Sequence, residues 1–198
     1  MKNKSSISKI LLAVLGVIAV VIIAIVVWGI STSNNLMTLR EDVRMQQSQV
    51  ETTLQRRSDL IPNLVNTVKG YATHEEEVFT EIADARSKLA GSIESGDIDS
   101  ISESNNELDS ALSRLLAITE SYPDLKASEQ FTSLQDELAG TENRINVARQ
   151  HYNEKVMTYN TTVQRFPTSI IANISGYSPA EYFEASEEAQ EVPEVNFN

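Results

Sequence analysis

An unbroken apolar run from residue 10 to residue 30 constrains this chain more than any other feature. The run contains 21 residues and no charged side chain. Because an α-helix rises about 1.5 Å per residue, the run would span roughly 30 Å, the thickness of a bilayer's hydrocarbon core. A cleavable signal peptide is the alternative, but its apolar core usually holds only about 7–15 residues and ends at a small-residue cleavage site. Residues 27–31 contain no such site, so we expect a retained transmembrane helix over residues 10–30.

Positive charges on either side of the run indicate its orientation. Three lysines lie in the short N-terminal tail, residues 1–9, whereas Arg40 and Arg44 follow the run. The positive-inside rule then favours a cytoplasmic N-terminus by a margin of one charge. We therefore expect a single-pass protein of the cell membrane, with the lipid bilayer as one partner and the following residues on the extracytoplasmic side.

The chain beyond the run is acidic and contains no cysteine. From residue 31 onward, 13 Lys or Arg residues stand against 28 Asp or Glu residues, a net charge of −15. A surface with this charge repels nucleic acid, so we expect no DNA or RNA partner. The lack of cysteine excludes disulfides, zinc-thiolate sites, thiol catalysis and lipid attachment through a thiol.

Apolar residues after the run recur at the spacing of an amphipathic helix. A seven-residue series begins at Leu36 and continues through Val50 and Leu64, with a companion series four residues on. Such a 4-3 pattern is typical of one face of a helix. Pro62 costs about 3 kcal/mol or more inside a helix, but the pattern keeps its phase across it, so we expect a kink rather than a break. We predict one helix over residues 36–90.

The remaining sequence predicts further helices and connectors. Residues 91–97 form a connector, and helices follow at residues 101–122, 128–166 and 168–173, with a brief last helix from Ser178 to Phe183. The sequence Ser-Pro-Ala-Glu at the start of that last helix is a capping box. The five small polar residues at 31–35 predict a hinge, and residues 184–198 predict an acidic disordered tail.

These elements predict an all-α fold. Amphipathic helices joined by short connectors must bury their apolar faces against one another. We expect an N-terminal transmembrane helix followed by a long antiparallel three- to four-helix bundle over residues 36–183.

One ten-residue segment and several shorter ones match a known pattern. Residues 56–65 read RRSDLIPNLV, and VKGYA follows at residues 68–72. Further matching segments are YPDLKA at 122–127, LQDEL at 134–138, TENRI at 141–145, and the Tyr-Asn pairs at 152–153 and 159–160. In these segments the chain resembles the LemA family of bacterial membrane proteins. The resemblance implies one N-terminal membrane helix and an antiparallel bundle of long helices, and it implies no enzymatic reaction.

Arg57 is a charged residue within the predicted apolar face. An unpaired buried charge is costly, so one interpretation pairs Arg57 with a carboxylate of another helix, which would set the register of the bundle. The other interpretation places it in a partner-docking site at the proline kink, where a smooth helix surface is interrupted. The residues of that hypothetical site are Arg56, Arg57, Asp59, Pro62 and Asn63. The sequence leaves both interpretations open.

Residues suited to catalysis or metal binding are scarce. His74 and His151 each precede a glutamate by three residues, but the additional inward carboxylates of a di-metal bundle are missing. The sequence has no Ser–His–acid motif and no phosphate-binding glycine loop. We therefore expect no catalytic residues, no metal and no cofactor. Aromatic residues that recur along the helices are expected to pack in the core: Tyr71, Tyr122, Tyr152, Tyr159 and Phe166.

Two hypotheses for the function remain. The first is a non-enzymatic scaffold or adaptor, anchored in the membrane, that acts through protein–protein interaction at the cell envelope. Its partners would be other membrane proteins and further copies of the same chain. The second is a sensor, a ligand-binding helical bundle coupled to the membrane anchor, which would require an internal pocket.

Overall fold

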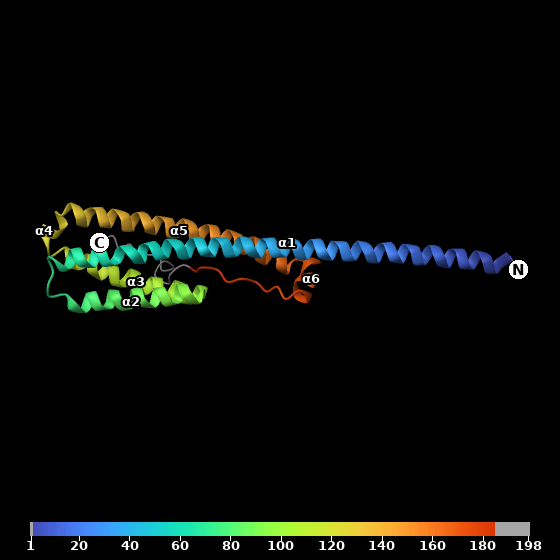
Figure 1. Cartoon of the computed structure of the whole chain (residues 1–198), viewed down its shortest axis with the longest axis horizontal. Coiled ribbons are helices and arrows are strands. Elements are labelled where there is room, and N and C mark those ends of the chain that lie inside the picture. The colour runs from blue at the N-terminus through green and yellow to red at the C-terminus, as the bar shows by residue number, and fades with distance from the viewer. Residues whose placement is uncertain (1, 185–198) are drawn as a thin grey trace, which may run out of the picture. The chain divides into compact units, whose positions relative to one another are not determined.

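The computed structural model describes residues 2–184, and every regular element in that range is a helix. The elements are α1 (Lys2–Lys69), α2 (Glu76–Ser95), α3 (Ile98–Thr119), α4 (Pro123–Lys126), α5 (Glu129–Gln164) and α6 (Thr168–Ile174) (Figure 1). The predicted all-α fold with an apolar N-terminal helix is confirmed. The predicted N-terminal tail is helical from Lys2, and the predicted acidic tail lies outside the described residues except for Glu184.

The chain forms two compact units. Unit 1 comprises residues 1–42 and 157–180, and unit 2 comprises residues 43–156 and 181–198. The boundary between the units falls within α1 and again within α5, so each of these helices contributes to both.

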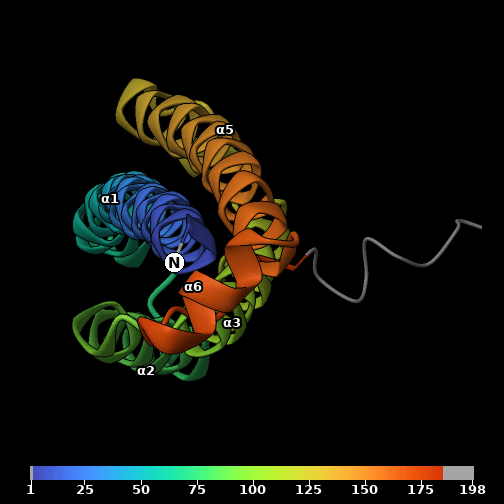
Figure 2. The same ribbon diagram turned by 90° about the vertical axis from the view of Figure 1, so that its right-hand side faces the viewer.

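Unit 2 is an antiparallel arrangement of four long helices. The C-terminal part of α1, then α2, α3 and the first part of α5 run in alternating directions, and α2 and α3 lie side by side (Figures 1 and 2). Its core consists of buried aliphatic and aromatic side chains, among them Val50, Leu54, Ile61, Leu64, Ile82, Leu89, Ile101, Leu108, Leu115, Phe131 and Ile145. Each fully buried side chain of this kind contributes about 1.5–3 kcal/mol to the free energy of folding.

The predicted single helix over residues 36–90 is wrong, because the chain turns between α1 and α2. The amides of Tyr71 and Ala72 both donate to Val68 O at 2.9 Å, which closes the end of α1. The seven-residue pattern keeps its phase across the turn because both helices bury their apolar faces in one core, as Val68 and Ile82 show. Local periodicity therefore could not reveal the reversal. Within α1, Pro62 is half-buried and does not break the helix.

Residues 31–35 are helical, where the sequence had predicted a hinge. None of the five is glycine or proline, and polar residues of this kind cost only about 0.7 kcal/mol or less each in a helix. Thr38 Oγ1 donates to Asn34 O at 3.1 Å, and Leu36 is fully buried in the next turn. Packing just beyond the polar residues thus carries the helix through them.

The connector between α2 and α3 is shorter than the predicted residues 91–97. Gly96 has a φ of 70°, in the left-handed region that favours glycine, and its N–H bonds Ser92 O at 3.1 Å. Asp97 caps α3 by accepting a hydrogen bond from the Ser100 amide at 2.8 Å. This hydrogen bonding from Ser100 holds the pKa of Asp97 below its ordinary value. Two residues therefore suffice for the reversal.

The predicted brief helix from Ser178 to Phe183 is wrong, because residues 177–184 form no helix. In unit 1, Tyr159 OH donates to Ser178 O at 2.9 Å. The Asn160 side chain binds both backbone groups of Ala180: Nδ2 donates to the carbonyl and Oδ1 accepts from the amide, each at 2.8 Å. These contacts occupy the carbonyls of Ser178 and Ala180, which in a helix would accept from amides four residues further on.

In unit 2, a second Tyr-Asn pair of α5 makes the same kind of contact. Tyr152 OH donates to Glu181 O at 2.9 Å. Asn153 Nδ2 donates to Phe183 O at 2.9 Å, and its Oδ1 accepts from the Phe183 amide at 3.0 Å. The rings of Tyr152 and Phe183 pack edge to face at 5.0 Å. An asparagine amide can replace the neighbouring backbone that an extended segment would pair with in a sheet.

The aromatic residues divide between core and surface. Tyr152 and Tyr159 are buried as predicted, and burial raises the pKa of Tyr152 to about 12 and also raises that of Tyr159. The core prediction is wrong for Tyr71 and Phe166, which are 45% and 77% exposed. Tyr122 is half-buried and donates to Glu75 Oε1 at 3.1 Å.

Candidate functional site

The five residues of the predicted docking site do not share one environment. Arg56, Asp59 and Asn63 are exposed on α1, and Pro62 is half-buried. Arg57 is only 7% exposed and points into unit 2. Arg57 therefore does not belong to an accessible docking surface. The hypothetical docking site is reduced to Arg56, Asp59, Pro62 and Asn63.

Arg57 lies at the centre of a buried polar network that links three helices. Its Nη2 pairs with Asp109 Oδ1 of α3, and its Nη1 lies 2.8 Å from Glu142 Oε2 of α5. Nη1 also donates to Asn105 Oδ1 at 3.3 Å, and Asn105 Nδ2 donates to Asp109 Oδ2 at 2.8 Å. The interpretation that pairs Arg57 with carboxylates of other helices is thus the one that holds.

Arg149 of α5 is a second buried arginine near this network, on the side of the C-terminal segment. Its guanidinium lies 5.5 Å from the centroid of the Phe183 ring, a cation–π contact. Burial lowers the pKa of Arg149, and the charge of Arg57 adds to this effect, while Glu142 and Asp109 oppose it. Two arginines thus face two carboxylates in unit 2.

The geometry of the network is only partly optimised. Within the described residues, Arg57 Nε and two nitrogens of Arg149 are buried without a hydrogen-bond partner. Glu142 Oε2 is close enough to Arg57 for an ion pair, although the two groups are not aligned as a hydrogen bond. A buried network of this kind often adds little net stability, but it penalises any other register of the helices. The network is therefore suited to fixing the register of three helices and not to proton transfer.

Part of this network was indicated by the sequence pattern. Arg57 and Asn105 both interrupt apolar series on their helices, and both are buried. Asp109 and Glu142 were missed because their side chains are each 37% exposed and lie at the edge of the apolar faces. Only the packing of α1, α3 and α5 brings the four side chains together.

A shallow hollow adjoins two of the exposed docking residues. Its lining comes from α1 and α2 and comprises Glu51, Thr52, Gln55, Arg56, Asp59 and Ile93. Gln55 Nε2 donates to Asp59 Oδ1 at 2.9 Å, which orients the carboxylate along the helix surface. Arg56 and Asp59 therefore offer opposite charges at the rim of one hollow.

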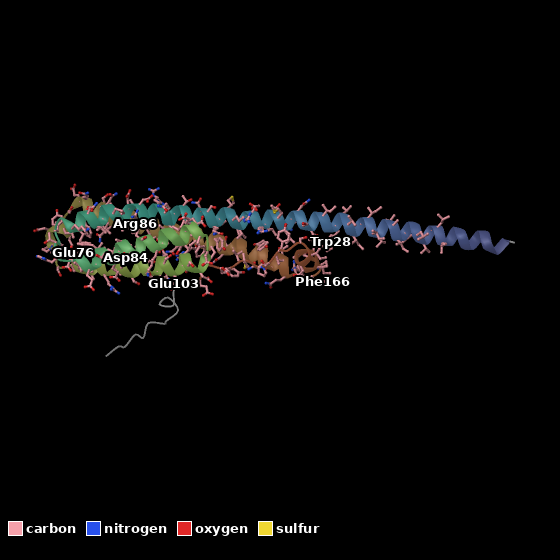
Figure 3. The ribbon with its side chains drawn as sticks, turned by 60° about the horizontal axis from the view of Figure 1, so that its bottom comes forward. Trp28, Glu76, Asp84, Arg86, Glu103 and Phe166 are labelled. Carbon is pink, nitrogen blue, oxygen red and sulfur yellow. The ribbon has the colours of Figure 1, made fainter. Side chains whose placement is uncertain are left out.

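A second hollow lies on α2 and α3 and is strongly acidic. Its carboxylates are Glu76, Glu77, Glu81, Asp84 and Glu107. Figure 3 labels Glu76 and Asp84, which both lie on α2. Both cations in the lining are paired: Lys88 Nζ lies 2.7 Å from Glu107, and Arg114 Nη1 lies 2.9 Å from Glu81. The hydrogen bond to Glu107 raises the pKa of Lys88. Nearby, Arg86 Nε donates to Ser58 O at 2.9 Å and ties α2 to α1.

The two histidines lie outside any ligand cluster. His151 Nδ1 is 3.4 Å from Glu154 Oε2, and both side chains are more than half exposed. Within residues 2–184 there is no group of three or more histidine, aspartate or glutamate side chains arranged to hold a metal ion.

The apolar segment of α1, residues 11–30, is compatible with a membrane anchor. Its most apolar window has a mean hydropathy of 3.3, and none of that window is buried. Its side chains are exposed throughout, for example Leu12 at 70% and Val20 at 67%. By length and composition the segment can cross a bilayer.

Comparison with known proteins identifies a matching family and several relatives. The LemA family model matches residues 46–197. The chain is 28% identical over 174 residues to Magnetosome protein MamQ 2 of Paramagnetospirillum magneticum, and 27% identical over 173 residues to Magnetosome protein MamQ of Magnetospirillum gryphiswaldense. Both matches cover 76% of this chain, which spans only 64% of the length of these relatives. Protein LemA of Metamycoplasma hominis is 27% identical over 160 residues, which are 80% of this chain and 71% of that protein.

Proposed function

This chain belongs to the LemA family, and on that premise we propose that it is a non-enzymatic scaffold or adaptor of the cell envelope. The apolar segment of α1 anchors it in the membrane, and the helices of unit 2 bind other membrane proteins. The name "magnetosome protein" belongs to the MamQ relatives. The chain spans 64% of their length, so what they assemble with does not define the partner here.

The exposed apolar segment is the single observation that carries the proposal. Twenty consecutive residues from Leu11 to Ile30 carry no charge, and they lie on the same helix that supplies Leu54 and Leu64 to the core of unit 2. Each large apolar side chain left in water forgoes about 1.5–3 kcal/mol, so the segment needs an apolar environment. A bilayer supplies that environment over the required length.

The polar interior of unit 2 supports a binding role over a catalytic one. Arg57, Arg149, Asp109 and Glu142 balance one another in charge, and Arg57 pairs with both carboxylates. A catalytic acid or base would need an accessible group that can exchange a proton with a substrate. We therefore place the function on the exposed faces of the helices.

The exposed face around Pro62 is our candidate docking surface. Arg56, Asp59 and Asn63 follow one another at helical spacing and project outward. The charges of Arg56 and Asp59 at the rim of the hollow suit a partner segment that carries polar groups of both signs.

Crosslinking in intact membranes tests the scaffold proposal. The wild type, an Arg56→Ala/Asp59→Ala double variant and an Arg114→Ala control, which lies on α3 with a 65% exposed side chain, are crosslinked and their captured proteins identified. We expect the double variant to lose a partner that the wild type and the control retain. A double variant that folds and keeps every partner would remove this docking surface. Turnover of a substrate by the purified full chain would overturn the non-enzymatic assignment.

Labelling in whole cells tests the proposed side of the membrane. The chain has no native cysteine, so a Val147→Cys variant carries one thiol, at a side chain that is 53% exposed on α5. We expect a membrane-impermeant maleimide to label it in intact cells. A Lys4→Cys control should react only after the cells are permeabilised. The reverse pattern would place unit 2 in the cytoplasm.

A further inference from the structure

Helix α6 packs against the end of the apolar segment of α1. Both elements belong to unit 1, and α6 lies beside α1 in Figure 1. A methyl carbon built on Gly29 would lie 3.5 Å from Ile171 Cδ1, so the isoleucine packs directly on the glycine. Ala172 on the same helix is only 1% exposed. Because Gly29 is the penultimate residue of the apolar run, this contact fixes α6 at the level where the run ends.

α6 and the turn before it also present large apolar side chains that remain exposed in unit 1. Phe166 is 77% exposed, Ile170 49% and Ile174 78%. Ile170 and Ile174 are four residues apart and lie on one side of α6, and Phe166 lies in the turn that precedes the helix. Apolar residues on both sides of a short helix are typical of a helix buried in protein or in lipid. Ile171 and Ala172 make the protein contacts, whereas Ile170 and Ile174 remain largely exposed within the described part of the chain.

The residues of unit 1 beyond the apolar run lack the strong negative charge of unit 2. Residues 31–42 and 157–180 carry two Arg and two Asp or Glu residues, a net charge of 0, and the three lysines of unit 1 lie before the apolar run, at its other end. The segment 157–180 has a single charged residue, Arg165, which immediately precedes Phe166. Basic residues beside an apolar patch favour anionic lipid headgroups, whereas carboxylates would be repelled.

An aromatic ring on α1 marks the same level. Trp28 is 39% exposed at the end of the apolar segment, and Figure 3 shows Phe166 at the same position along α1 as Trp28. Tryptophan is enriched where the apolar part of a bilayer meets the headgroups. Trp28, Gly29 and α6 thus define one zone at the exit of the apolar segment.

We propose that α6 and the turn before it form a second membrane contact, in which Phe166 of the turn and Ile170 and Ile174 of the helix insert into the interfacial region of the bilayer. Arg165 lies at the headgroups, and the packing of Ile171 on Gly29 holds α6 at this depth. The occupant of the exposed face is the lipid surface itself. This inference depends on the proposed anchoring of α1, because α6 takes its level from that helix.

Site-specific fluorescence in vesicles tests the inference. Because the chain has no native cysteine, single variants Ile174→Cys, Ile170→Cys, Val20→Cys and Val147→Cys can each carry one environment-sensitive dye in the full chain. The proteins are reconstituted in vesicles of phosphatidylcholine and phosphatidylglycerol that contain lipids spin-labelled either near the headgroup or deep in the acyl chain. Val20→Cys reports on the anchor, and Val147→Cys reports on water.

We expect the dye at residue 174 to emit at shorter wavelength than the dye at 147 and to be quenched best by the shallow spin label. Interfacial helices bury their apolar side only about 5–10 Å into the bilayer. The side chain of residue 20, within the anchor, should lie deeper than this. The dye at residue 170 should behave in the same way, which guards against a local disturbance at 174. The dye at residue 20 should be quenched best by the deep label.

Three outcomes would overturn the inference. If residue 20 is quenched but residues 170 and 174 behave like residue 147, α6 faces water while the anchor stands. If the dye at 174 shifts only with protein concentration and without lipid quenching, the face belongs to a second copy of the chain. If the dye at residue 20 is not quenched either, both the proposed membrane anchoring of α1 and the inference about α6 are wrong.

Discussion

The two units distribute apolar and charged side chains in opposite ways. Of the 25 large apolar side chains exposed in the described part of the chain, 20 belong to unit 1. Unit 1 carries a net charge of +3, whereas the residues of unit 2 carry 11 Lys or Arg and 26 Asp or Glu, a net charge of −15. Unit 2 therefore has the surface of a protein in water, and unit 1 has a surface suited to lipid.

The contrast is informative because α1 and α5 contribute to both units. The backbone conformation is helical on both sides of residue 42 and of residue 156. What changes along α1 is which side chains face outward: aliphatic all round before residue 30, and polar beyond it. Secondary structure is thus common to the two units, and the environment that each requires is set by side-chain placement alone.

The largest expected effect comes from charging the apolar segment of unit 1. A Val17→Arg/Val21→Arg double variant should leave the membrane fraction, because each arginine costs about 2.5–3.5 kcal/mol at the centre of a membrane helix. Fractionation of membranes followed by immunodetection measures this. Val147→Arg, at an exposed position of unit 2, should remain in the membrane. Retention of the double variant would contradict the contrast between the units.

The next largest effect concerns the buried network of unit 2. Arg57→Ala leaves Asp109 and Glu142 without their shared cation, so we expect a loss of about 2–4 kcal/mol in the free energy of unfolding. This is below the value for a fully buried pair, because both carboxylates are 37% exposed. Urea denaturation measures the change. The neighbouring Arg56→Ala, at an exposed position, should change the free energy of unfolding by no more than about 0.5 kcal/mol. Equal losses in the two variants would show that the buried network does not stabilise unit 2.

The two Tyr-Asn pairs allow the same substitution to be compared in each unit. Asn160→Ala in unit 1 and Asn153→Ala in unit 2 each remove two hydrogen bonds to an extended backbone. We expect each to cost about 1–3 kcal/mol locally. Hydrogen exchange should accelerate at the Ala180 amide in the first variant and at the Phe183 amide in the second.

An exposed asparagine on the same helix provides the control for this comparison. Asn143→Ala should leave the exchange of both the Ala180 and the Phe183 amides unchanged. Acceleration of both amides by either of the two single variants would mean that the extended segment detaches as one piece.

The smallest effect is a pH dependence at alkaline pH. Burial, followed by the charge of Glu181, raises the pKa of Tyr152 from 10.0 to about 12. A raised pKa means that the neutral form stabilises the fold below pH 10 and that this contribution disappears as the pH rises through 12. Urea denaturation across this range should show a steeper loss in the wild type than in Tyr152→Phe.

Tyr159 in unit 1 gives the weaker counterpart of this dependence. Burial also raises its pKa, but the nearby charge of Arg40 opposes the rise. Tyr159→Phe should therefore flatten the alkaline loss less than Tyr152→Phe. A larger effect in Tyr159→Phe would contradict the prediction that burial perturbs Tyr152 of unit 2 more than Tyr159 of unit 1.

Much of the fold was predictable because it depends on local chemistry. The apolar run and the 4-3 spacing of residues such as Leu36 and Leu64 specify helices without reference to the rest of the chain. The residues before Pro123 and Pro167 leave the helical region, so the helix ends near them were also predictable. The acidic composition and the resemblance in residues 56–65 were likewise visible in the sequence alone.

Tertiary contacts decided the features that the sequence left open or indicated wrongly. The turn between α1 and α2 keeps the heptad phase, so only the packing of Val68 and Ile82 in one core reveals it. Arg57 lies inside rather than at a docking surface because Asp109 and Glu142 reach it from two other helices. The capping-box sequence at Ser178 stays extended because asparagines of α5 bind its backbone. In each case the deciding partner is distant in the chain, and local propensities of a few tenths of a kcal/mol per residue are smaller than the contacts that oppose them.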